Sequence, residues 1–218
     1  MTHALKSDTG SRNVKKLVRL GLGVAAAGAI VAAGLAPRVL AQSVPADAIA
    51  PTTALTTTIG QTQTLTVSQT EGPYFKTNSP ERSALVTDST QGTLLTVTGQ
   101  VLAADGTPVA NALLDFWQAD ASGAYDNSGY TLRGHQYTDE NGNYTLTTVV
   151  PGLYPGRTRH IHVKVQAPGG PTLTTQLYFP GEARNSTDGI FDPSLVLNTQ
   201  SNTDGTENAT FNFVVQTA

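Results

Sequence analysis

Hydrophobic and polar residues alternate in short segments from about residue 94 onward, with β-branched and aromatic residues at many apolar positions. Alternation with a period of two is typical of β-strands. The predicted strands are residues 94–102, 113–119, 143–150, 160–167, 172–179 and 209–216, separated by turn sequences such as "DENGN" (139–143) and "PGLYPG" (151–156). No segment after Pro45 has a convincing helical period. The pattern predicts an all-β fold, an antiparallel β-sandwich with long loops.

The first 41 residues have the pattern of an export signal. Five basic residues precede an uncharged run from Leu20 to Ala36, and "VLAQ" (39–42) offers small residues at the spacing of a cleavage site. The alternative is a retained membrane anchor, for which the run is short and rich in glycine. Asn13 stands where a twin-arginine signal has its second arginine, so the export route stays open. We expect an exported protein, periplasmic or secreted.

Residues 42–67 are rich in Thr, Ala and Pro and almost uncharged, which predicts a flexible linker. Residues 68–218 then form one domain, long enough to bury a hydrophobic core. Without residues 1–41 the chain has 7 basic and 15 acidic side chains, a net charge of −8. This charge argues against nucleic acid as a partner and against stable membrane association after signal cleavage. Because the chain has no cysteine, a bound metal would need nitrogen and oxygen ligands.

Two of the four histidines, His160 and His162, are one residue apart in a predicted strand. Alternate residues of a strand leave the same face, so both imidazoles can reach one metal ion while Ile161 and Val163 face the core. Tyr154, on the turn before this strand, can add an oxygen donor. The alternative is a pair of solvent-facing histidines beside a tyrosine that packs at the end of a hairpin.

The hairpins of residues 96–154, closing on "PGLY", resemble prealbumin-like sandwich modules, many of which are passive binding domains. Longer blocks resemble a more specific family. These blocks are "QTEGPYF" (69–75), "GQVLAADGTPVANALLDFWQADASGAYD" (99–126), "TDENGNYTLTTVVPGLYPGRTRHIH" (138–162) and "TTQLYF" (174–179). In this order, over roughly residues 68–190, they resemble the intradiol ring-cleavage dioxygenases, the family of catechol and protocatechuate dioxygenases.

The resemblance implies one non-haem Fe(III) ion per chain, held by two tyrosinates and two histidines: Tyr125, Tyr154, His160 and His162. It places Arg157 and Gln176 in the active site and gives His135 no ligand counterpart. It also puts Gly72, Pro73 and Tyr74 near the substrate pocket, where Trp117 forms a wall. Two phenolates and two neutral imidazoles are a hard, charged donor set that suits ferric iron better than zinc.

The implied reaction opens a catechol ring between its hydroxyl-bearing carbons, uses both atoms of O2 and yields a muconate-type diacid. Tyr154 then acts as ligand and as base, and the Arg157 guanidinium stabilises developing negative charge. The partners are a catechol-type small molecule and O2, and a homo-oligomer stays open. The alternative function is an exported prealbumin-like binding or adhesion module with a non-functional metal site.

Some features depart from the catechol and protocatechuate enzymes. Gly156 replaces a bulky residue of the protocatechuate type, which predicts a shallower and more open pocket. Arg159 stands where the family usually has proline or alanine and is expected to add a cation beside the iron. The helical dimerisation region of the catechol enzymes is absent. The resemblance is therefore to the exported branch of the family.

Overall fold

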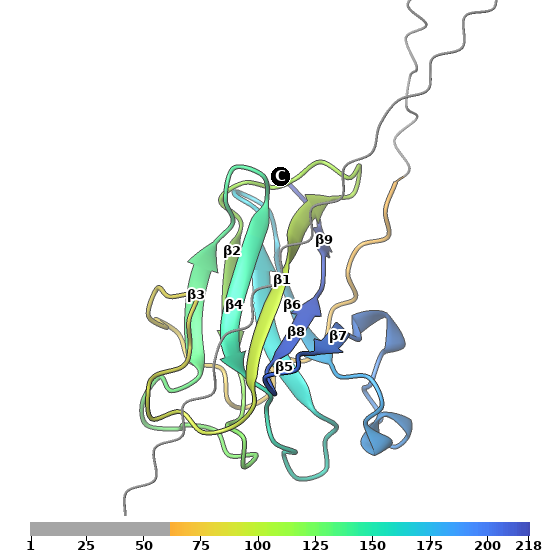
Figure 1. The fold of residues 1–218 in the computed structure, drawn as a ribbon. Helices are drawn as coiled ribbons and strands as arrows, with labels where there is room; N and C mark the ends of the chain where they lie inside the picture. The colour runs from red at the N-terminus through yellow and green to blue at the C-terminus, as the bar shows by residue number, and fades with distance from the viewer. Residues whose placement is uncertain (1–61) are drawn as a thin grey trace, which may run out of the picture. The chain divides into compact units, whose positions relative to one another are not determined.

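The computed structural model describes residues 62–218, which form two β-sheets (Figure 1). The first sheet has the order β4-β1-β8-β7, with β9 also paired to β1. Its strands are β1 (Leu94–Ala103), β4 (Asn143–Val149), β7 (Asn198–Ser201), β8 (Glu207–Thr210) and β9 (Phe213–Val215). The second sheet has the order β3-β2-β5-β6, made of β2 (Leu113–Trp117), β3 (Arg133–Tyr137), β5 (His160–Gln166) and β6 (Thr172–Tyr178). Two short 3-10 helices, η1 (Ala183–Ser186) and η2 (Pro193–Leu195), lie between β6 and β7.

The predicted all-β sandwich is confirmed, and every predicted strand is present. Two details of the prediction are wrong. The sandwich is not wholly antiparallel, because β8 and β9 both run parallel to β1. The predicted strand 209–216 is two strands, β8 and β9, and the sequence pattern does not predict β3 or β7.

The break between β8 and β9 lies beside Gly99 of β1. A Cβ atom on Gly99 would lie 1.7 Å from the carbonyl oxygen of Phe211, so glycine is required at this close approach. The Phe211 amide donates to the Thr98 carbonyl, and the Gln100 amide donates to the side-chain oxygen of Asn212. The ladder to β1 is therefore interrupted at Phe211 and Asn212, which still form hydrogen bonds with β1. The segment pairs with β1 as β8 before this break and as β9 after it.

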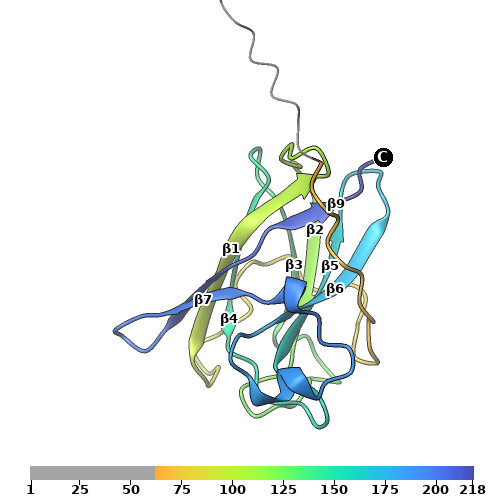
Figure 2. The ribbon, with the colours of Figure 1, turned by 90° about the vertical axis from the view of Figure 1, so that its right-hand side faces the viewer.

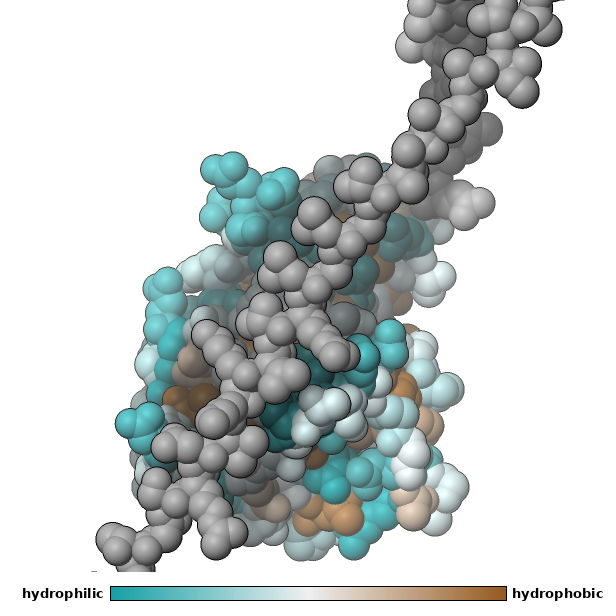
Figure 3. Space-filling view, viewed as in Figure 1, coloured by the Kyte–Doolittle hydropathy of each residue, from teal (hydrophilic) through white to brown (hydrophobic). Residues whose placement is uncertain are grey.

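The core lies between the two sheets, where alternate residues of each strand point inward. Eleven of these residues are 0% exposed: Leu95, Val97, Val101, Leu114, Phe116, Leu146, Ile161, Val163, Val165, Leu177 and Phe213. Burying each such side chain contributes about 1.5–3 kcal/mol to stability. On the face seen in Figure 3, hydrophobic residues form small separate areas among hydrophilic ones. The alternation of apolar and polar residues in the sequence thus places apolar side chains in the interior and mostly polar ones on the outer face.

The predicted signal peptide, residues 1–41, and most of the predicted linker lie outside the described residues. The last linker residues, 62–67, run along the domain (Figure 2). The Gln63 amide donates to Ala104 O at 2.6 Å, and the Thr66 amide donates to Val214 O at 2.9 Å. Within residues 62–218, no helix is long and apolar enough to span a membrane.

The outer face of the second sheet carries polar and aromatic residues and is covered by the arm, residues 68–80. The Gln69 amide donates to Thr174 O of β6, and the Phe75 ring packs edge-on against Trp117 of β2. Lys164 of β5 lies over the Phe75 ring at 4.2 Å and forms an ion pair with Glu71 of the arm. These contacts hold the arm over the face of β5 that bears the two histidines.

Candidate metal centre

The two histidines of β5 point away from the core and are buried beneath the arm. His160 is 4% exposed and His162 is 3% exposed, whereas their neighbours Ile161 and Val163 are 0% exposed within the core. The two imidazole rings lie side by side, with centroids 4.8 Å apart. The alternative of two solvent-facing histidines is therefore wrong.

The hydrogen bonds of His160 leave one of its ring nitrogens free for a metal. Nδ1 donates to the Thr158 carbonyl at 2.7 Å, so the lone pair of the neutral ring is on Nε2, which lies 3.2 Å from the Tyr125 hydroxyl. Burial lowers the pKa of His160 to about 4. Burial also holds the pKa of His162 well below its ordinary value, with the proximity of His160 as a second cause. Both rings are thus neutral at physiological pH, as a metal ligand must be.

Tyr125 is held by two loop turns that flank it. The Asp120 carboxylate accepts hydrogen bonds from the backbone amides of Ser122 and Ala124, and the Asp126 carboxylate accepts from the three amides that follow, at residues 128, 129 and 131. Such turns fix the backbone between two aspartates. Burial raises the pKa of the Tyr125 phenol, against the effect of the nearby Arg157 guanidinium.

Tyr154 is brought beside Tyr125 by close packing of two loops. The Gly152 amide donates to Asp120 O at 2.7 Å. Gly123 has φ +91, and a Cβ atom on it would lie 2.5 Å from the carbonyl oxygen of Leu153. The two tyrosine rings then meet edge-on, with centroids 5.7 Å apart. Glycine at 123 therefore permits the approach that joins two of the predicted ligands.

Arg157 and Gln176 also meet at this site. Arg157 Nη2 donates to Gln176 Oε1 at 2.7 Å, and Gln176, which is 0% exposed, donates to the carbonyl of Thr70 in the arm at 2.9 Å. Arg157 Nε forms an ion pair with Asp188 at 2.8 Å. The sequence does not predict Asp188 as a site residue, because no motif includes it and the contact spans 31 residues of chain.

The arm supplies a third tyrosine and a glycine to the same place. Tyr74 stacks on Tyr125 with ring centroids 4.4 Å apart, and its hydroxyl lies 2.8 Å from the Tyr154 hydroxyl. Gly72 has φ +70, and a Cβ atom on it would lie 3.5 Å from His162 Cε1. Pro73, between them, is exposed. The three residues predicted near the pocket thus lie over the histidines and tyrosines.

The donors that converge are two imidazoles and two phenols. Within residues 62–218, no three His, Cys, Asp or Glu side chains gather in a way that could hold a metal ion, so a metal at this place needs the tyrosine oxygens. His162 Nδ1 is buried and has no hydrogen-bond partner in this part of the chain. Buried neutral imidazoles and partly exposed ionisable phenols in one cluster fit an ion that prefers nitrogen and charged oxygen ligands.

Comparison with known proteins shows the family of the chain. The family model described as "Dioxygenase" matches residues 70–217. The chain belongs to the intradiol ring-cleavage dioxygenase family. The match covers nearly all of the domain predicted for residues 68–218.

Two solved structures show how closely the dioxygenase domain follows this family. The dioxygenase domain of a dioxygenase carbohydrate-binding protein fusion from Streptomyces sp. SirexAA-E is 58% identical; the match covers 71% of this chain and 100% of that domain, with a TM-score of 0.69. The 3-chlorocatechol 1,2-dioxygenase of Rhodococcus opacus 1CP is 31% identical; the match covers 73% of this chain and 75% of that one, with a TM-score of 0.67.

A 6-chlorohydroxyquinol 1,2-dioxygenase of Cupriavidus pinatubonensis is 31% identical over 171 residues, which is 66% of this chain and 62% of that protein. The chain spans about half to three-fifths of the length of the first curated relatives that it matches.

Two expectations about individual residues of the dioxygenase domain are corrected by their contacts. Trp117 is 1% exposed and its ring stacks on the His162 ring, with centroids 4.9 Å apart, so it supports the histidine instead of forming an open pocket wall. Arg159 forms an ion pair with Glu182 at 2.6 Å and donates to the carbonyl of Pro151. Its charge is compensated there, so it does not add a free cation to the site.

His135 lies apart from the pair on β5. It is on β3, and its Nδ1 lies 3.1 Å from the hydroxyl of Ser79, which donates to Asp115. This placement agrees with the expectation that His135 is not a ligand.

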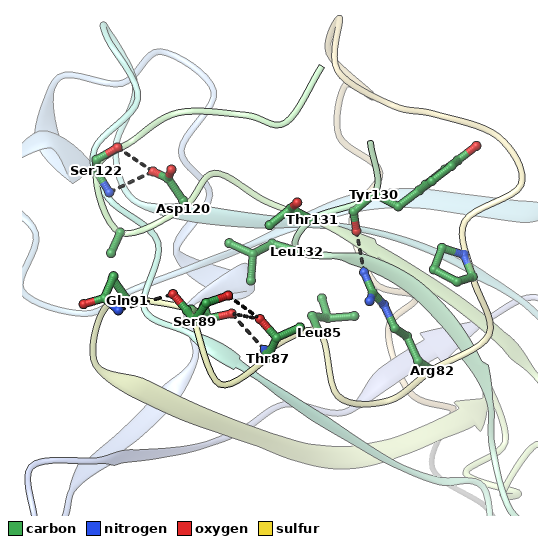
Figure 4. Close-up of a pocket in the computed structure, with 13 residues that line it drawn as sticks. Arg82, Leu85, Thr87, Ser89, Gln91, Asp120, Ser122, Tyr130, Thr131 and Leu132 are labelled. Carbon is green, nitrogen blue, oxygen red and sulfur yellow. Dashed lines mark hydrogen bonds between the residues drawn. The ribbon is translucent and has the colours of Figure 1, made fainter. Parts of the chain in front are cut away.

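The dioxygenase domain also has a cavity whose lining includes neither His160 nor His162. It has a volume of about 630 Å3 and contains none of the predicted site residues (Figure 4). Its polar groups are bonded within the domain: Arg82 donates to the Tyr130 and Arg133 carbonyls, and Asp120 accepts from Ser122. The lining therefore shows no polar group that needs a ligand.

Proposed function

We propose that the chain is a non-haem Fe(III)-dependent intradiol dioxygenase that opens a catechol-type ring with O2 to give a muconate-type diacid. Family membership supports the reaction class, and several relatives are named as catechol or hydroxyquinol 1,2-dioxygenases. The observation that carries the proposal is the convergence of Tyr125, Tyr154, His160 and His162 in one cluster, in which the imidazoles are buried and the phenols are partly exposed.

The cluster suits ferric iron. Two phenolates would compensate much of the charge of a trivalent ion, and two neutral imidazoles complete a set that zinc seldom uses. When bound, the ferric ion supplies Lewis acidity, which lowers the pKa of a catechol hydroxyl and makes the ring reactive toward O2.

Tyr154 is the proposed proton acceptor for the substrate. Its hydroxyl oxygen is hydrogen-bonded to the Tyr74 hydroxyl, so its position is fixed before substrate binds. Tyr125 instead packs against the Tyr74 ring, and its hydroxyl lies 3.2 Å from His160 Nε2, which suits a ligand that stays bound throughout turnover. The two tyrosines thus have different roles because one has a hydroxyl neighbour and the other an imidazole neighbour.

Arg157 is the proposed stabiliser of developing negative charge. Its cationic guanidinium is anchored by Gln176 and Asp188 beside the tyrosines. A fixed cation near a reacting centre stabilises a transition state more than a mobile one, because it needs no reorientation.

The test is reconstitution of the purified chain with Fe(III). We expect about one tightly bound iron per chain, visible absorption from tyrosinate-to-iron charge transfer, a spectral shift with catechol under anaerobic conditions, and O2 uptake with catechol. Colourless protein without bound iron would instead favour the binding or adhesion module. A panel of substituted catechols and hydroxyquinols in the same assay identifies the preferred substrate.

We further propose that the enzyme acts outside the cytoplasm. The support is the charge and hydrophobicity pattern of residues 1–41, which lie outside the described residues. Cell fractionation with an antibody, together with the N-terminal sequence of the mature protein, tests both export and cleavage. Sedimentation of the iron-loaded protein decides between a monomer and a homo-oligomer.

A further inference from the structure

Asp188 is a buried carboxylate in the loop between η1 and η2, outside the sequence blocks that resemble the family. Its side chain is 3% exposed. Its Oδ2 accepts hydrogen bonds from Arg157 Nε at 2.8 Å and from the Thr158 amide at 2.9 Å, and its Oδ1 accepts from the Ile190 amide at 3.2 Å. A carboxylate held by two amides and one cation has a fixed position and direction.

The Arg157 guanidinium is a planar fork that is held at two of its three nitrogens. Nε is bonded to Asp188 and Nη2 to Gln176, while Nη1 has no hydrogen-bond partner within residues 62–218. The Arg157 side chain as a whole is 21% exposed. Because the fork is rigid, fixing two corners also fixes the direction of the third.

The same carboxylate acts on the backbone before β5. Thr158, whose amide donates to Asp188, accepts the Nδ1–H of His160 at its carbonyl, at 2.7 Å. The hydroxyl of Thr158 donates to Asn185 Oδ1 at 2.6 Å. The segment 183–190 therefore holds the turn that carries both the arginine and a predicted metal ligand.

We propose that Asp188 is a positioning residue of the site, which acts through Arg157 by directing its free Nη1 toward the substrate. The inference rests on the proposed function, since it assigns Arg157 a task in ring cleavage. Gln176 alone would leave the guanidinium free to rotate about a single hydrogen bond. Asp188 supplies the second bond and compensates the charge of the arginine.

Asp188→Asn tests this, since it keeps the size of the side chain and removes its charge. We expect kcat to fall by roughly 10- to 100-fold, while anaerobic catechol affinity changes by less than about threefold. Asp192→Asn is the matched control, because within residues 62–218 the Asp192 carboxylate accepts hydrogen bonds only from Ser194, at the start of η2. It should keep wild-type kcat.

A double variant separates positioning from a general structural role. Arg157→Lys alone should keep iron, colour and catechol binding but lose most of its turnover. Arg157→Lys with Asp188→Asn should be no slower than Arg157→Lys alone, within about twofold, because the two residues act as one unit. Losses that multiply in the double variant would overturn the inference.

NMR of protein loaded with diamagnetic Ga(III) needs no turnover. The Nε–H proton of Arg157 should exchange slowly with solvent in the wild type and rapidly in Asp188→Asn. Its signal is identified as the one that is absent from the spectrum of Arg157→Lys. If the wild type cleaves no catechol, the proposed function fails, and this signal still decides whether Asp188 positions Arg157. A fast-exchanging Nε–H in the wild type, or unchanged protection and kcat in Asp188→Asn, would overturn the inference.

Discussion

The hydroxyl oxygens of Tyr74 and Tyr154 lie 2.8 Å apart, although 80 positions separate the two residues in the chain. The hydrogen bond to Tyr154 is the main cause that raises the pKa of Tyr74, so Tyr74 keeps its proton at neutral pH. Tyr74 therefore donates to Tyr154 when the Tyr154 oxygen is anionic. The arm thus contributes a proton donor to a site otherwise built from the loops and β5.

Tyr74→Phe should slow substrate chelation while iron content stays unchanged. Loss of the hydroxyl removes the hydrogen bond that holds the Tyr154 oxygen in place, and we expect the chelation rate to fall by about tenfold, the effect of roughly 1.4 kcal/mol. Stopped-flow mixing with anaerobic catechol measures this rate. Tyr137→Phe is the control, since Tyr137 is 51% exposed on β3. A wild-type rate in Tyr74→Phe would show that the bond has no part in chelation.

Metal affinity should rise with pH because metal binding displaces a proton from Tyr125. Burial raises the pKa of this phenol, so it is protonated in the metal-free protein between about pH 6 and pH 9. His160, with a pKa of about 4, is already neutral in this window and releases none. Each proton displaced makes the affinity rise about tenfold per pH unit.

Calorimetry in buffers of different ionisation enthalpy counts the protons released per metal ion. Tyr125→Phe should release one proton fewer than the wild type and show a shallower pH dependence. Equal proton release by the two proteins would mean that Tyr125 is not a ligand.

His160→Ala and His162→Ala should each abolish tight iron binding and leave the sandwich folded. Both imidazoles lie on the face of β5 opposite the core, so their removal leaves the apolar interior unchanged. His135→Ala, whose ring contacts Ser79, should keep iron and colour. Metal analysis and circular dichroism of the three variants check this. Loss of iron from His135→Ala to the same extent would refute the ligand assignment.

The strands that the sequence predicts are those whose alternation reflects one buried face. The sequence does not predict β3, "RGHQY", because its inward positions are the polar Gln136 and Gly134, where a Cβ atom would lie 2.7 Å from Leu85 Cδ2. Nor does it predict β7, "NTQS", an all-polar edge strand paired with β8. Strand pairing in space, which local pattern does not encode, produces both.

Site residues within the motifs could be named from the sequence, but their partners could not. The tyrosines and histidines come from blocks that resemble the family, and the structure brings them together. The pairing of Arg157 with Asp188, and of Arg159 with Glu182, depends on how the loop after β6 folds back. Sequence spacing gives no information on such contacts, so the surroundings that the sequence predicts for the Arg159 charge are wrong.

Gly123→Ala should destabilise the domain and lower its affinity for iron. At φ +91 an alanine is strained, and its Cβ would lie 2.5 Å from Leu153 O, so the loops of Tyr125 and Tyr154 would separate. We expect a loss of about 1–3 kcal/mol in the free energy of unfolding. Gly189→Ala is the control, because a Cβ there meets nothing within 4 Å. Urea denaturation measures the free energy of unfolding of both variants, and iron titration measures their affinity for iron. Equal values for Gly123→Ala and Gly189→Ala would contradict the expectation.

The most direct measurement is mass spectrometry of the product that the iron-loaded chain forms from catechol under 18O2. The account predicts a muconate-type diacid carrying one 18O atom in each new carboxyl group, and no such product from His160→Ala. A product without 18O, a ring opened beside the two hydroxyl-bearing carbons, or equal product from His160→Ala would contradict it.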